Sequence, residues 1–140
     1  MDGSRLSTRV DGVADLHLVD QVLDALENLW ADAAFVPPED RMLFTLAVSE
    51  VTTNVAQHSE SPPPVTLSVQ IAVTRGMLSA VIQDSAPPVT VNWDDVELPD
   101  ELGESGRGLA LTRMALDEVE HRSDDRGNTW TLRRGFVPES

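Results

Sequence analysis

The sequence predicts a single α+β domain in which helices pack on one face of a mostly antiparallel, mixed sheet. Three observations support this class: two segments with helical spacing of apolar residues come first, a pair of alternating segments follows, and a short helix precedes a second such pair. The chain has 140 residues and shows neither an internal repeat nor a linker. We therefore expect one domain over residues 1–140, with its core at about 10–136.

The first part of the chain is expected to form an edge strand and two helices. Residues 6–10 alternate in polarity, as a strand does. Asp15 is a suitable N-cap for a helix whose apolar residues recur at helical spacing, namely Leu16, Val19, Leu23, Leu26 and Trp30. The prolines at 37 and 38 end this helix, and Pro38 can then occupy the first turn of a second helix that runs to about His58.

The rest of the chain is expected to form two hairpins with a loop and a helix between them. Three prolines at 62–64 stop the second helix, after which residues 65–73 and 77–82 alternate on either side of a turn at Gly76. Residues 85–108 are rich in proline, glycine and acid, and are typical of a loop. A third helix over 109–116 and a last hairpin of 119–122 with 129–133 complete the order.

Composition excludes several functional classes. Ten basic residues oppose 24 acidic ones, a formal net charge of −14, which disfavours binding to nucleic-acid phosphates or to an anionic membrane surface. The absence of cysteine excludes disulfides, thiolate nucleophiles and cysteine-based zinc sites. Because 41% of the residues are hydrophobic, and no leader or membrane-length apolar stretch occurs, we expect a soluble cytoplasmic domain.

The second helix carries polar residues within its apolar stripe. Glu50, Asn54 and His58 are four residues apart, and a helical wheel places them among Leu43, Ala47 and Val51. Burying a carboxylate and an amide there costs several kcal/mol unless partners satisfy them. A carboxylate at such a position can act as a general base, and an amide oxygen can join the shell of Mg²⁺. In the alternative, the helix end turns out of the core and leaves these side chains exposed, which suits His58 better than Glu50.

A glycine-rich segment forms a second candidate site. Gly103, Gly106 and Gly108 precede the apolar helix that starts at Leu109, and Arg107 adds a cation. Glycines let backbone N–H groups approach phosphate, and a helix N-terminus favours anions. The alternative is a flexible connector, and the segment is not a P-loop because no Gly-Lys-Ser/Thr follows.

Six acidic residues lie just before or among these glycines. They are Asp94, Asp95, Glu97, Asp100, Glu101 and Glu104, and no Lys or Arg occurs between Gly76 and Gly106. One interpretation is a solvated lid. The sharper hypothesis is that this acidic face meets a basic surface on a protein partner.

These motifs together resemble those of the ATPase superfamily that comprises gyrase, heat-shock chaperones, histidine kinases and MutL. Glu50, Asn54 and His58 match its N-box, and Asp84-Ser-Ala-Pro-Pro88 stands where its first glycine box lies. Gly103 to Leu109 resembles the second box, and Gly127-Asn-Thr129 resembles the closing strand. The resemblance covers about residues 10–136 and implies a Bergerat-type ATP-binding fold, a two-layer α/β sandwich.

Within the superfamily, the chain is similar to bacterial anti-sigma-factor serine/threonine kinases of the RsbW and SpoIIAB type. The segments LAVSEVTTNVAQH and ESGRGLAL are close to those of this subgroup, and no helix pair with a phosphoacceptor histidine is present. The resemblance implies ATP and Mg²⁺ as cofactors, with Glu50 as the catalytic base and Asn54 as the Mg²⁺ ligand. Asp84 would bind the adenine amino group, with Thr129 nearby.

The resemblance assigns further residues to ATP binding and also implies partners. The assigned residues are His58, Ala86 in place of the first glycine of its box, Gly103, Gly106, Arg107, Gly108 and Leu109. Members of the subgroup bind a sigma factor and a small antagonist protein, which they phosphorylate on Ser or Thr, and so regulate transcription in stress responses. A homodimer is also implied, whereas direct contact with nucleic acid or membrane is not.

Two other functions remain open at this level. The first glycine box lacks both glycines, and Pro88 removes a backbone donor, so the chain could instead be an inactive module that regulates by binding a sigma factor or antagonist. A sensor-kinase fragment would need a separate histidine-bearing partner. His17, His58 and His121 are not spaced as metal ligands, which disfavours a zinc enzyme.

Overall fold

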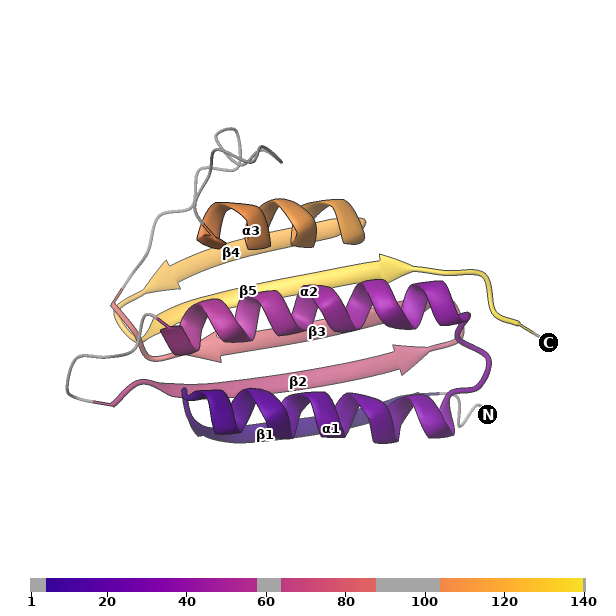
Figure 1. Cartoon of the computed structure of the whole chain (residues 1–140), viewed down its shortest axis with the longest axis horizontal. Coiled ribbons are helices and arrows are strands. Elements are labelled where there is room, and N and C mark those ends of the chain that lie inside the picture. Colours follow the sequence, from indigo (N-terminus) through magenta and orange to yellow (C-terminus); the bar gives the residue numbers. More distant parts are fainter. Residues whose placement is uncertain (1–4, 58–63, 88–103, 140) are drawn as a thin grey trace.

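The structure is a computed structural model that describes residues 5–57, 64–87 and 104–139, with the backbone alone at 104–109. The described elements are β1 (Leu6–Val13), α1 (Leu16–Asp32), α2 (Pro38–Gln57), β2 (Thr66–Thr74), β3 (Met77–Asp84), α3 (Glu104–Ala115), β4 (Glu118–Asp124) and β5 (Gly127–Gly135). Figure 1 shows two layers, with the three helices side by side on one face of the sheet. The α+β fold predicted from the sequence is confirmed.

The sheet has the strand order β1-β2-β3-β5-β4. All four described pairings are antiparallel, so the described strands contain none of the parallel pairing that a mixed sheet requires. The two predicted hairpins are present as β2–β3 and β4–β5. The first turns at Gly76, whose φ of 124° is a conformation that glycine adopts without strain.

The core lies between the sheet and the helices. Alternate residues of β2 are buried against the helices, as the period-two pattern predicts. Asp15 caps α1 by accepting the N–H of Leu18 at 2.8 Å, which confirms the predicted N-cap. Leu16, however, is 61% exposed, because the buried face of α1 is formed by Leu18, Val19, Val22, Leu26 and Leu29.

The buried face of α2 is rotated from its predicted position. The buried residues are Phe44, Ala47, Val48, Val51, Thr52 and Val55. Thr52 belongs to this buried face although it is polar, because its hydroxyl donates to the carbonyl of Val48 at 2.9 Å and is therefore satisfied inside the core. The stripe thus centres about 110° around the helix from Leu43. Glu50 and Asn54 lie on its flank, half-buried, so their predicted place in the middle of the stripe is wrong.

α3 begins earlier than predicted. It starts at Glu104, so Gly106, Arg107 and Gly108 belong to the helix, and their assignment to a loop is wrong. Glycine costs a helix only about 1 kcal/mol relative to alanine, so these glycines can continue the helix formed by the apolar residues that follow them. Among the described residues, no helix combines the length and the apolar character that crossing a bilayer requires.

Arg134 on β5 contacts two of the helices through an ion pair and a hydrogen bond. Arg134 on β5 donates to Asp40 in the first turn of α2 at 2.8 Å, and the two side chains are only 17% and 14% exposed. The same guanidinium donates to the carbonyl of Ala115, the last residue of α3, at 2.7 Å. Arg134 therefore sets how α2 and α3 lie relative to each other and to β5.

Candidate functional site

The candidate site lies at the end of the molecule where β3 ends and β5 begins. Figure 1 shows the C-terminal end of α2 and the start of α3 at this same end. Because β3 and β5 are antiparallel, the last residue of β3, Asp84, pairs with Asn128 near the start of β5. Residues from the N-box helix, the first glycine box and the closing strand are therefore brought to one end of the fold.

Glu50 and Asn54 occupy the side of α2 that faces α3. The opposite side faces α1, because the indole N–H of Trp30 on α1 donates to the hydroxyl of Thr45 at 3.0 Å. Glu50 and Asn54 lie about 140° and 180° around the helix from Thr45. Since α2 runs between α1 and α3 (Figure 1), both side chains point toward the space between α2 and α3.

Asp84 presents one carboxylate oxygen bound to the protein and one available for a ligand. The residue is 7% exposed, and a carboxylate so buried requires hydrogen-bond donors. Its Oδ1 accepts the N–H of Ala86 at 2.9 Å and the Nδ2 of Asn128 at 2.9 Å. Within the described part of the chain, Oδ2 accepts no hydrogen bond.

Asn128 is a site residue that the sequence analysis missed. It is 3% exposed, and its Nδ2 lies 3.1 Å from the carbonyl oxygen of Pro87 and 3.4 Å from that of Ala86. Its Oδ1 lies 3.0 Å from Nε2 of His121 on β4. Alternation along β5 carries the missed signal, since Trp130 and Leu132 are apolar and Asn128 must share their face.

Thr129 points to the other face of the sheet. It is half-buried, pairs with Gln83, and lines a cavity of about 740 Å³ on the uncovered face together with Arg9 and Ser68. The structure therefore places Asn128, and not Thr129, beside the carboxylate of Asp84. The reason is the period of two along a strand, which sends neighbouring side chains to opposite faces.

Gly127 is required by the close approach of two strands. Its φ is 142°, and a Cβ atom built on it would lie 1.8 Å from the carbonyl oxygen of Asp84. Any side chain here would displace the residue that carries the site carboxylate. The glycine of the closing motif thus has a steric explanation.

The remaining predicted residues are only partly described. His58, Gly103, Asp94, Asp95, Glu97, Asp100 and Glu101 lie outside the described residues. Gly106, Arg107, Gly108 and Leu109 are described as backbone in the first half of α3, as is Glu104. The first-turn N–H groups of this helix suit an anion. No three acidic or histidine side chains among the described residues could together hold a metal ion.

Comparisons with known proteins concern the family and the fold of the chain. The sequence matches the family described as histidine kinase-like ATPase domain over residues 13–134. No curated protein matches it significantly.

Two solved structures share the fold. The crystal structure of the RsbU and RsbW domains of Rv1364c from Mycobacterium tuberculosis aligns with 95% of this chain at a TM-score of 0.66 and 17% identity. The histidine kinase domain of the EL346 blue-light activated histidine kinase from Erythrobacter litoralis aligns with 84% at a TM-score of 0.54 and 19% identity. The alignments span 32% and 59% of those two chains, and at such identities the similarity concerns the fold.

Proposed function

Because the chain belongs to the histidine kinase-like ATPase domain family, we propose that it is an ATP- and Mg²⁺-dependent protein serine/threonine kinase that acts as an anti-sigma factor. The observation that carries the proposal is the Asp84 carboxylate, which is held on one oxygen by Ala86 and Asn128 at the end of the molecule where α2 ends and α3 begins. The fold shared with a structure that contains an RsbW domain supports the subgroup.

Asp84 suits recognition of the base. Its Oδ2 would accept a hydrogen bond from the exocyclic amino group of adenine, while Oδ1 keeps its two protein donors. A base with a carbonyl oxygen at that position would place two acceptors against each other. The arrangement therefore favours adenine over hypoxanthine or guanine.

The phosphate end of the site would use α2 and α3. Asn54 would provide an amide oxygen to Mg²⁺, which commonly completes its shell with phosphate oxygens and water. The free N–H groups at the start of α3 would bind phosphate oxygens. When bound, ATP would supply the phosphoryl group and Mg²⁺ would neutralise the charge that develops during its transfer.

Glu50 would act as the general base. Its half-buried carboxylate sits one turn from Asn54 on the same flank of α2, and would take the proton of a serine or threonine hydroxyl on the partner. The partners proposed are a sigma factor and a small antagonist protein that is phosphorylated, in the cytoplasm. The acidic residues at 94–104 are proposed to meet a basic surface on one of them.

A substitution at Glu50 tests this function. We expect Glu50→Ala to retain MgATP binding and to abolish phosphoryl transfer to proteins captured from the native cell, measured by calorimetry and by labelled-ATP transfer. Glu39→Ala is the matched control, because Glu39 is exposed in the first turn of the same helix. Undiminished transfer by Glu50→Ala would contradict the role of Glu50.

A second candidate is a binding module without phosphoryl transfer. Ala86 and Pro88 stand where the two glycines of the first box would lie, and proline lacks the backbone N–H that glycine offers a ligand. Absence of binding heat when the protein is titrated with MgATP at high micromolar concentration would favour the module over the kinase.

A further inference from the structure

A continuous hydrogen-bonded chain links β4 to the site carboxylate. His121 Nε2 lies 3.0 Å from Asn128 Oδ1, and Asn128 Nδ2 lies 2.9 Å from Asp84 Oδ1. Asn128 and Asp84 are separated by 44 residues in the sequence, and both are buried. These hydrogen bonds thus connect the β4–β5 hairpin to the β2–β3 hairpin on the face of the sheet that the helices cover.

The direction of each hydrogen bond follows from the acceptors around Asn128. Its Nδ2 faces three oxygens, those of the Asp84 carboxylate and of the Ala86 and Pro87 carbonyls, so this atom must be the donor. Oδ1 of Asn128 is then the acceptor. The hydrogen atom between Asn128 Oδ1 and His121 Nε2 must therefore be carried by Nε2. An imidazole that carries a hydrogen on Nε2 meets this requirement.

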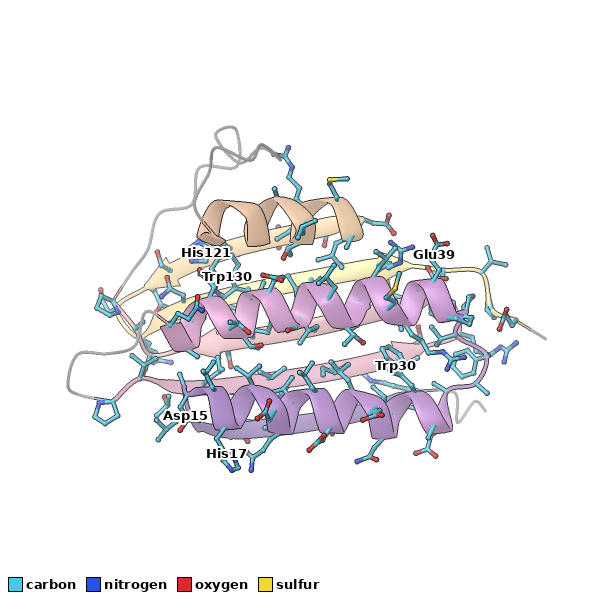
Figure 2. All side chains as sticks on the ribbon, viewed as in Figure 1. Asp15, His17, Trp30, Glu39, His121 and Trp130 are labelled. Carbon is cyan, nitrogen blue, oxygen red and sulfur yellow. The ribbon has the colours of Figure 1, made fainter. Side chains whose placement is uncertain are left out.

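His121 is itself held by packing. Its ring lies against Trp130, with the centroids 4.4 Å apart, and the two residues face each other across β4 and β5. Trp130 is 3% exposed. Figure 2 shows both side chains on the helix-covered face of the sheet, near the start of α3. The imidazole therefore presents Nε2 to Asn128 from a position set by the core.

The same amide also holds the segment that replaces the first glycine box. Asn128 binds the carbonyls of Ala86 and Pro87, and Ala86 in turn donates its N–H to Asp84. One side chain thus orients the carboxylate and anchors the two residues that follow it.

We propose that His121 and Asn128 form a positioning relay that aims Asp84 Oδ2 at the exocyclic amino group of the nucleotide base. The proposal rests on the proposed function, in that it takes an adenine nucleotide as the ligand of Asp84. Neither residue touches the phosphates or the hydroxyl acceptor. The relay therefore acts on base affinity and base discrimination.

The test compares MgATP with MgITP by calorimetry, because inosine carries a carbonyl oxygen where adenosine carries the amino group. Asn128→Leu removes the donor at similar volume and is expected to weaken MgATP binding about 10- to 100-fold, the range for a hydrogen bond to a charged group. His121→Phe keeps an aromatic ring against Trp130 and is expected to weaken it about 3- to 10-fold. In both variants the preference for ATP over ITP should fall by a similar factor.

Two further variants separate positioning from folding. His121→Gln retains an N–H near the position of Nε2 and is expected to restore affinity to within about twofold. Gln83→Ala is the matched control, because Gln83 adjoins Asp84 on β3 but lies on the uncovered face of the sheet. This variant should leave the affinities for MgATP and for MgITP unchanged.

The remaining outcomes are decisive. If the wild type prefers ATP and His121→Phe keeps both affinity and preference within twofold, the relay is refuted. Equal weakening of ATP and ITP, or unfolding of both Asn128→Leu and His121→Phe, shows a structural role and also overturns it. If the wild type binds no MgATP, the proposed function fails, and the relay loses its ligand with it.

Discussion

Replacing Gly127 by alanine tests whether the close approach of β5 to Asp84 is essential. The added Cβ would lie 1.8 Å from the carbonyl oxygen of Asp84 and 2.9 Å from Cα of Ser85, both backbone atoms. Ordinary contact begins at 3.4 Å, so the two strands must separate by 3.4 Å less 1.8 Å, or about 1.6 Å. The hydrogen bond of 2.9 Å between Asn128 and Asp84 does not survive such a shift.

The cost has two parts. The φ of 142° is unfavourable for a residue with a Cβ by roughly 1–2 kcal/mol. Loss of a hydrogen bond to a charged group adds about 1.5–3 kcal/mol. Together these predict a loss of about 3–5 kcal/mol in the free energy of unfolding, which corresponds to a fall in Tm of roughly 10–20 °C for a domain of this size.

Gly76→Ala is the matched control for this substitution. Gly76 also has a positive φ, of 124°, but within the described residues its added Cβ would meet only the carbonyl oxygen of Phe136, at 3.8 Å. This variant therefore carries the backbone strain alone, with a fall in Tm of about 5 °C.

Thermal unfolding followed by circular dichroism measures both variants, and calorimetry with MgATP follows at a temperature where each is folded. We expect Gly127→Ala to lose nucleotide binding and Gly76→Ala, at the far end of the β2–β3 hairpin, to keep it. If the Tm of Gly127→Ala lies within 2 °C of that of Gly76→Ala, the steric argument is wrong.

Three further predictions concern stability and titration. Arg134→Met breaks a largely buried pair with Asp40 and should lower the free energy of unfolding by about 3 kcal/mol in urea denaturation. Arg133→Met breaks an exposed pair with Glu118 and should lower it by less than about 1 kcal/mol. Equal losses in the two variants would contradict the anchoring role of Arg134. Asp15→Ala removes the N-cap of α1 and should lower the free energy of unfolding by about 1 kcal/mol in urea denaturation. Asp20→Ala, at an exposed position of the same helix, is the control and should leave the free energy of unfolding unchanged. The hydrogen bonds of Ser68 and Arg9 to Asp11 hold the pKa of that carboxyl below its ordinary value of 3.8. Because the folded pKa is the lower one, the contribution of Asp11 to stability is present above 3.8 and is lost as the pH falls through the folded value. An NMR titration of the side chain should show this pKa rise in Ser68→Ala, and an unchanged midpoint would refute the assignment.

The types and order of the elements could be predicted from the sequence because they depend on local chemistry. Alternation over residues 65–73 and 77–82 is a property of neighbouring residues, and it gave the β2–β3 hairpin almost to the residue. The cap at Asp15 likewise depends on one side chain and an N–H three residues away.

The faces of the helices were harder to predict because burial depends on what packs against them. The pattern over 41–58 placed Leu43 in the apolar stripe, yet Leu43 is only half-buried, whereas Phe44 and Thr52 are fully buried. A hydroxyl that bonds its own helix can replace an apolar side chain in the core, and no polarity scale registers this. The start of α3 was missed because a cluster of glycines is typical of a loop, although each glycine costs a helix only about 1 kcal/mol.

The sequence by itself determined the order of strands and helices along the chain, and its motifs predicted that Glu50, Asn54, Asp84 and Thr129 belong to one site, because motif spacing and periodicity are carried by the chain alone. Only the tertiary structure decided which side chain stands beside Asp84. That choice depends on the register of β3 against β5, in which Asp84 faces Asn128, and a shift of one residue would send the opposite set of side chains to the covered face. Register is settled by the burial of Trp130 and Leu132 and by the close approach at Gly127. These are contacts between segments more than 40 residues apart, and they place Asn128 and His121 in the site.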